Sequence, residues 1–104
     1  MLDGAPQTAA ALYAAHKEDV DAVLARYGVR KLVAFGSRAR GSGRPDSDLD
    51  LAGQLPRGAD LFDVVRLKED LETAFGTPID FVPLSGARPR LRARIAKEGV
   101  TLVA

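Results

Sequence analysis

Residues 33–51 read Val33-Ala34-Phe35-Gly36-Ser37-Arg38-Ala39-Arg40-Gly41-Ser42-Gly43-Arg44-Pro45-Asp46-Ser47-Asp48-Leu49-Asp50-Leu51. The apolar run at the start predicts a strand, and a loop rich in glycine, serine and arginine follows it. The alternation of acid and leucine at the end predicts a second strand. Side chains alternate between the two faces of a strand, so we expect Asp48 and Asp50 to share one face while Leu49 and Leu51 point into a core.

The chemistry of this stretch indicates a phosphate-handling site. Two carboxylates on one face repel each other unless a positive charge lies between them. Mg²⁺ supplies such a charge, and it is bound by a few carboxylates together with substrate phosphates. The preceding loop offers backbone N–H groups, the Ser37 hydroxyl and the cations Arg38, Arg40 and Arg44, all of which can hold phosphate. Together these groups predict phosphoryl or nucleotidyl transfer.

Length and composition limit the remaining choices. The 104 residues, of which 46% are hydrophobic, predict a single domain spanning 1–104. The chain has no cysteine, which excludes a disulfide framework and a thiolate metal site. No stretch approaches the roughly 18 apolar residues of a membrane span. The N-terminus lacks the pattern of a signal peptide, so we expect a cytoplasmic protein without a membrane partner.

The net charge is +1, but the charges fall into blocks. Residues 31–45 hold four cations and no acid, residues 46–80 hold nine acids and three cations, and residues 81–104 hold five cations and one acid. This distribution argues against a uniformly basic nucleic-acid-binding surface, so nucleic acid is not an expected partner. It fits an acidic metal pocket flanked by basic segments.

The pattern along the chain predicts helices and strands in alternation. We expect helices at 8–27, 60–75 and 88–98, and strands at 30–35, 47–52, 78–83 and 100–103. Thr8 and Asp60 are N-cap candidates, and Gly28 and Gly76 lie where left-handed caps belong. We expect His16 and the acids Glu69, Asp70 and Glu72 to lie on solvated helix faces.

Two features remain open from the residues alone. If the strand at 78–83 pairs beside that at 47–52, Asp80 lies on the face carrying Asp48 and Asp50; otherwise it is an exposed polar residue on an edge strand. The last helix places Arg90, Arg94 and Lys97 on one face. That face could contact a nucleotide, RNA or an acidic partner, or it could be solvated.

The motif resembles a known signature. Phe35-Gly36-Ser37, a spacer of ten residues and Asp48-Leu49-Asp50-Leu51 resemble the signature of the DNA polymerase β-like nucleotidyltransferase superfamily. The fuller form, from Gly36 to Gly41 and from Ser47 to Leu51, is similar to its minimal nucleotidyltransferase (MNT) branch. Members of that branch are often antitoxins whose partner toxin is a helical HEPN-domain ribonuclease. The resemblance implies an α/β (α+β) fold with a small mixed sheet packed against helices.

The resemblance also implies the roles of individual residues. Gly36 and Ser37 would hold the triphosphate of ATP, and Arg38 or Arg40 would assist. Asp48 and Asp50 would ligate two Mg²⁺ ions. Asp80 would be the third acid of the metal site, next to the attacking hydroxyl, and its assignment depends on strand pairing.

Three functions are compatible with these observations. The first is an enzymatic antitoxin that transfers AMP to a tyrosine hydroxyl of a HEPN-type toxin. We expect the acceptor to come from a partner, because the chain leaves no segment to build an acceptor pocket. The second is a non-enzymatic antitoxin that masks its toxin by binding, and the third is a stand-alone transferase that modifies a small molecule or an RNA end. The acids favour an enzyme, since a pure binder has no use for three clustered carboxylates.

Overall fold

The two motif strands form the centre of a small mixed sheet. The computed structural model describes residues 8–39 and 48–104. The elements, in chain order, are α1 (Ala9–Ala15), α2 (Lys17–Tyr27), β1 (Lys31–Phe35), β2 (Leu49–Gln54), α3 (Leu61–Phe75), β3 (Ile79–Pro83), the short 3₁₀ helix η1 (Leu84–Gly86), α4 (Pro89–Glu98) and β4 (Val100–Val103). No helix within these described ranges is long and apolar enough to cross a membrane.

The sheet has the strand order β3-β2-β1-β4. β1 pairs antiparallel with β2 and with β4, while β2 and β3 run parallel. β1 therefore has a neighbour on each side, in agreement with its continuous apolar run, which is typical of a central strand. In this register Phe35 lies opposite Asp50, and Asp50 lies opposite Asp80.

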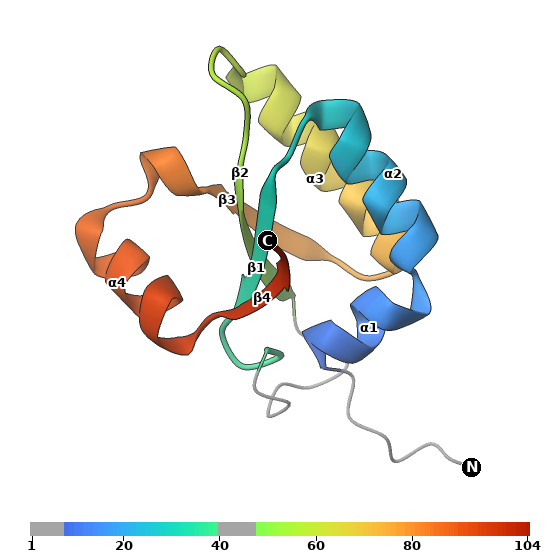
Figure 1. Ribbon diagram of the computed structural model, residues 1–104, viewed down its shortest axis with the longest axis horizontal. Coiled ribbons are helices and arrows are strands. Elements are labelled where there is room, and N and C mark those ends of the chain that lie inside the picture. Colours follow the sequence, from blue (N-terminus) through green and yellow to red (C-terminus); the bar gives the residue numbers. More distant parts are fainter. Residues whose placement is uncertain (1–7, 40–47) are drawn as a thin grey trace.

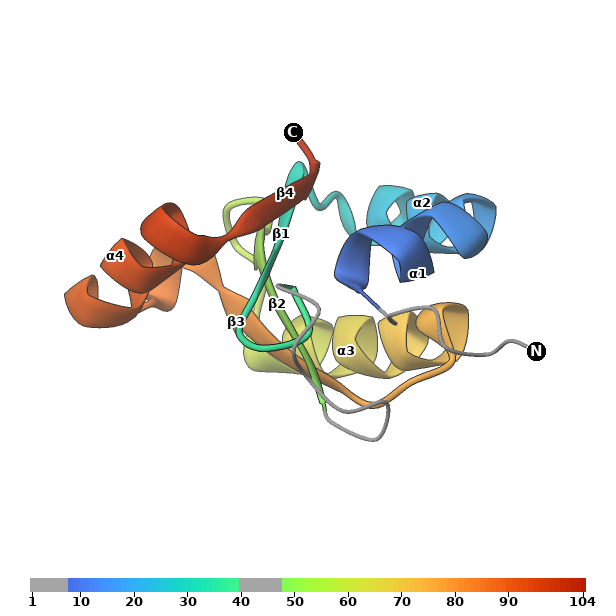
Figure 2. The same ribbon diagram turned by 90° about the horizontal axis from the view of Figure 1, so that it is seen from below.

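Helices cover both faces of the sheet. α1, α2 and α3 lie on one side and α4 on the other (Figures 1 and 2). Leu49 and Leu51 are fully buried in the larger core with α2 and α3, as the alternation predicted. The opposite face buries Val33, Phe35 and Ala52 against Ile95 of α4. Asp50 and Asp80 alternate with the larger core and thus lie on the α4 side of the sheet.

The predicted helix ends are confirmed. The Thr8 hydroxyl accepts a hydrogen bond from the Ala11 N–H at 3.1 Å, and Gly28 is left-handed. Asp60 and Asp63 form a capping box at the start of α3, with each carboxylate accepting the other residue's N–H. Three N–H groups at the starts of these helices thereby gain partners.

The prediction of one helix over 8–27 is wrong. The helix breaks at His16, whose backbone angles (φ −123°, ψ 26°) leave the helical region. No glycine or proline lies at the break. The break is instead explained by the contacts that α1 makes with the rest of the protein. Ala9 is fully buried, and its N–H donates to the Arg38 carbonyl at 3.3 Å. Docking of α1 against the motif loop thus gives it a direction different from that of α2.

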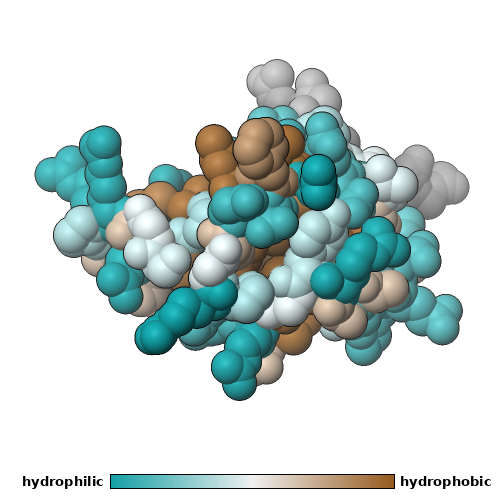
Figure 3. Space-filling view, turned by 90° about the horizontal axis from the view of Figure 1, so that it is seen from above, coloured by the Kyte–Doolittle hydropathy of each residue, from teal (hydrophilic) through white to brown (hydrophobic). Residues whose placement is uncertain are grey.

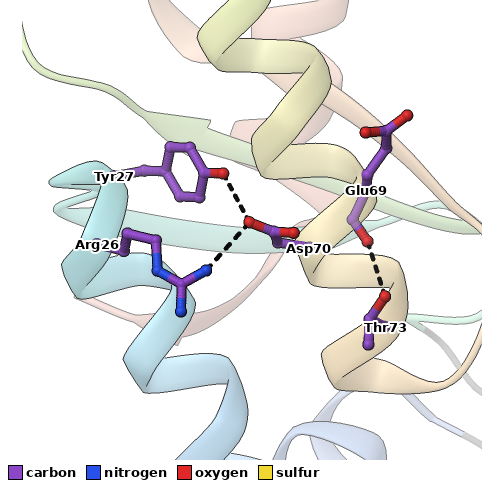
Figure 4. Close-up of polar contacts among 5 residues, drawn as sticks. All are labelled: Arg26, Tyr27, Glu69, Asp70 and Thr73. Atoms are coloured by element: carbon purple, nitrogen blue, oxygen red, sulfur yellow. Dashed lines mark hydrogen bonds and ion pairs between the residues drawn. The ribbon is translucent and has the colours of Figure 1, made fainter.

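The acids of α3 are not simply a solvated face, in contrast to the prediction. Asp70 accepts a hydrogen bond from the Tyr27 hydroxyl at 2.6 Å and one from Arg26 at 3.3 Å (Figure 4). The hydrogen bond to Asp70 raises the pKa of Tyr27. Glu72 accepts the Ile79 N–H at 2.9 Å. These contacts hold α2 on α3 and fix the beginning of β3; Glu69 alone fits the prediction, with an exposed side chain.

Candidate active site

Gly36, at the end of β1, lies directly against the Asp50 side chain. Its φ of 78° is in the left-handed region, which glycine adopts at little cost. A Cβ at this position would overlap the Asp50 carboxylate oxygen and would lie 3.3 Å from its carbon. Backbone geometry and space therefore both require glycine here, and the motif loop begins in contact with the acid.

The acids come together across the sheet. Asp50 on β2 and Asp80 on β3 are register partners on parallel strands, whose spacing is roughly 4.8 Å. Asp48 is exposed and immediately precedes β2, and its charge acts on Asp50. Burial raises the pKa of Asp50, and the charges of Asp80 and Asp48 raise it further. The strand pairing on which the placement of Asp80 depended is thus the one observed.

The position of Asp80 is fixed by the residue before it. Ile79 is buried in the core, and its N–H donates to the Glu72 carboxylate of α3. This hydrogen bond is the main reason that the pKa of Glu72 is lowered, with Lys68 adding to the effect. Glu72 therefore holds Ile79, the first residue of β3, in place and thereby sets the position of Asp80.

α4 contributes a cation to this site. The guanidinium carbon of Arg94 lies 5.9 Å from the centre of the Phe35 ring, which is the register partner of Asp50. The Arg94 charge opposes the rise in the pKa of Asp50. Its Nε lies 3.6 Å from a Glu98 oxygen. The sequence groups Arg94 with Arg90 and Lys97, and only the packing of α4 on the sheet separates Arg94 from the other two.

Arg38, one of the two arginines predicted to assist phosphate binding, is buried in the protein. Arg38 is only 3% exposed, and it donates a hydrogen bond to the Thr77 hydroxyl at 2.9 Å. Its side chain thus ties the motif loop to the turn between α3 and β3, and to meet a phosphate it would have to leave the interior. Ser37 is half-buried in the loop. Arg40 lies outside the described residues.

The donor chemistry of the site fits Mg²⁺. Within residues 8–39 and 48–104, no three acidic or histidine side chains are already arranged as a complete metal site. Mg²⁺ does not need such a set, because it is usually held by one or two carboxylates, substrate phosphates and water. The repulsion evident at Asp50 is what a divalent cation would relieve. Asp48, Asp50 and Asp80 are therefore suitable ligands.

The chain is similar in sequence to known nucleotidyltransferases. Residues 18–104 match the family described as polymerase beta, nucleotidyltransferase. The chain is 33% identical over 87 residues to a predicted protein adenylyltransferase of Methanocaldococcus jannaschii, which covers 84% of this chain and 94% of the relative. It is 31% identical over 86 residues to the protein adenylyltransferase MntA of Thermococcus cleftensis, covering 83% and 84%.

Solved structures share the fold. A predicted minimal nucleotidyltransferase superposes with a TM-score of 0.75 at 40% identity, covering 88% of this chain and 93% of the other. A complex of a tri-AMPylated Shewanella oneidensis HEPN toxin with its MNT antitoxin gives a TM-score of 0.67 at 21% identity, covering 86% and 70%. The second likeness concerns the fold alone.

Proposed function

This chain belongs to the polymerase beta nucleotidyltransferase family, and from that premise we propose that it is an antitoxin that transfers AMP from ATP to a tyrosine hydroxyl of a HEPN-type partner toxin. The observation that carries the proposal is the pairing of Asp50 with Asp80, with the Gly36 backbone against Asp50. The names of two relatives, both protein adenylyltransferases, support the choice of AMP as the transferred group and of a protein as the acceptor. The toxin–antitoxin complex with the same fold supports the kind of partner.

The residues divide the reaction between them. Backbone N–H groups at Gly36 and Ser37, with the Ser37 hydroxyl, hold the β- and γ-phosphates and direct the α-phosphate toward the carboxylates. Asp48 and Asp50, with Asp80, would hold Mg²⁺, which would neutralise phosphate charge and make a hydroxyl more acidic. Arg94 adds positive charge beside Asp50.

In this proposal Asp80 receives the proton of the acceptor. The tyrosine oxygen attacks the α-phosphorus, its proton passes to Asp80, and the bond from that phosphorus to the pyrophosphate oxygen breaks. AMP is left on the tyrosine and pyrophosphate departs. The exposed position of Asp80 on an edge strand keeps this side open to a large acceptor.

Masking without catalysis is the weaker alternative, because the clustered acids destabilise the metal-free protein. Burial and neighbouring like charges disfavour the ionised Asp50 in the metal-free protein. A surface that only covered a toxin would gain nothing from this arrangement. A divalent cation bound there, in contrast, would relieve the same repulsion.

Intact-mass spectrometry tests the proposal. The protein is incubated with ATP, Mg²⁺ and the protein encoded beside it, and Asp48→Asn/Asp50→Asn is the control. Nucleotidyl transfer predicts a gain of about 329 Da per AMP on the neighbour and none with the control. A stable complex without a mass change would support masking. If the neighbour is neither modified nor bound, the result would support a small molecule or an RNA end as the acceptor.

A further inference from the structure

A groove lies between α4 and the N-terminal end of α3, away from the acids. Its volume is about 1210 Å³. Its walls are the loop from Leu55 to Asp60 with the first turn of α3 on one side, and Arg92, Ile95 and Ala96 of α4 on the other. None of Gly36, Ser37, Asp48, Asp50 or Asp80 lines it. The groove is therefore a feature separate from the candidate active site.

The groove continues onto an exposed apolar patch, defined by Leu61, Phe62 and Val65. Their side chains are 74%, 72% and 45% exposed, and Leu61 also lines the groove. Figure 3 shows hydrophobic residues gathered on this face of the molecule. α3 contributes buried residues only from Leu67 onward. Its first turns thus present a cluster of large apolar side chains that residues 8–39 and 48–104 leave uncovered, which is typical of an interaction site.

Most of the charged residues that line the groove are cations. Lys31, Arg57 and Arg92 are exposed there. In the part of the chain that the structure describes, no carboxylate lies within ion-pair distance of these three cations. Asp60, the one acid among the described residues of the lining, accepts the Asp63 N–H in the capping box. The charge of the groove is therefore complementary to an acidic ligand.

We propose that the groove docks an acidic amphipathic helix of the acceptor protein, whose apolar side packs on Leu61, Phe62 and Val65. A helix with its side chains is about 10–12 Å across, so a groove of this size holds roughly two to three turns. Gln54, which lines the groove, is four residues from Asp50 on β2, so this part of the groove lies roughly 13 Å from the carboxylates, and Val33 lies nearer to them. A partner held there can present a hydroxyl to the site. That the docked protein is the acceptor rests on the proposed function; the docking itself does not.

A designed peptide tests the docking independently of catalysis. The probe is a fluorescent helical peptide with leucine at i, i+3, i+4 and i+7 and glutamate elsewhere, and its matched control carries lysine in place of glutamate. Binding is followed by fluorescence anisotropy, and the bound surface is mapped by amide chemical shifts. We expect saturable binding of the acidic peptide alone, with shifts at residues 54–64 and 92–99. Phe62→Ser and Arg57→Glu/Arg92→Glu should each weaken it at least about tenfold, whereas Arg90→Glu on the same helix should not.

Three outcomes would overturn the proposal. The first is failure of the acidic peptide to bind, or shifts that map to another surface. The second is self-association of the free protein that Phe62→Ser abolishes, seen by sedimentation, which would assign the patch to a second copy of this chain. The third is tighter binding of a short single-stranded RNA than of the acidic peptide. A protein that binds the peptide but transfers no AMP keeps the docking site and loses the proposed function.

Discussion

Replacing Asp50 with asparagine should stabilise the metal-free protein while abolishing nucleotide transfer. Asp50 and Asp80 are register partners, so their charges are separated by roughly 5 Å. At that distance two like charges repel by about 1 kcal/mol in water and about 3 kcal/mol at an effective dielectric constant of about 20. Asp80 is exposed and Asp50 only partly buried, so screening favours the lower figure. We therefore expect the free energy of unfolding to rise by about 1 kcal/mol at neutral pH.

The gain should depend on pH in a defined direction. The pKa of Asp50 is raised above its ordinary value of 3.8, first by burial and then by Asp80. The folded protein thus keeps this proton to a higher pH than the unfolded chain does. Wild-type stability is lost as the pH rises from 3.8 through the folded-state pKa, whereas the asparagine does not titrate. Below this window the two proteins should converge.

Urea unfolding without divalent ions, at pH 7 and at pH 3, measures both effects. Glu69→Gln, which removes an exposed acid of α3, is the matched control and should change little. Addition of Mg²⁺ at ten times its dissociation constant should then stabilise the wild type by about 1.4 kcal/mol and the Asp50→Asn variant by much less. The reasoning is refuted if the variant is less stable than the wild type at pH 7, or if the gain persists at pH 3.

Three further changes test the parts around the acids. Gly36→Ala should lose activity, and it should lose about 1–2 kcal/mol of stability from backbone strain alone. Gly76→Ala, which has a similar φ and open space around it, should lose stability only. Equal activities of the two variants would contradict the contact between Gly36 and Asp50. The lowered pKa of Glu72 gives the wild type stability above pH 4.5, which is lost as the pH falls through that pKa, and Glu72→Gln should remove this stability. Thermal unfolding of the variant with the same pH dependence as the wild type would refute this role of Glu72. Arg94→Gln should weaken transfer at least about tenfold while Arg90→Gln leaves it intact, measured as kcat/KM for ATP.

The core of the fold could be predicted from the motif stretch. The alternation Asp48-Leu49-Asp50-Leu51 identifies β2 and its buried face, and the run before Gly36 identifies a central strand. Both rest on periodicity, which is a local property of the chain. The capping residues of α3 were predictable for the same reason.

Features set by distant contacts could not be predicted in this way. The break at His16 follows from the docking of α1 on the motif loop, and no residue at the break signals it. Arg38 reads as a phosphate ligand by its place in a glycine-rich loop, yet its burial depends on Thr77, 39 residues away. The part played by Arg94 emerges only once α4 packs across the sheet.

The most direct test of nucleotidyl transfer uses ATP labelled at the α-phosphate in one reaction and at the γ-phosphate in another, each with Mg²⁺ and the neighbouring protein. The account predicts that the α label alone becomes attached to protein, at a rate lost in Asp48→Asn/Asp50→Asn, while the γ label leaves as pyrophosphate. Attachment of the γ label, or its release as free phosphate without transfer of the α label, would contradict the account.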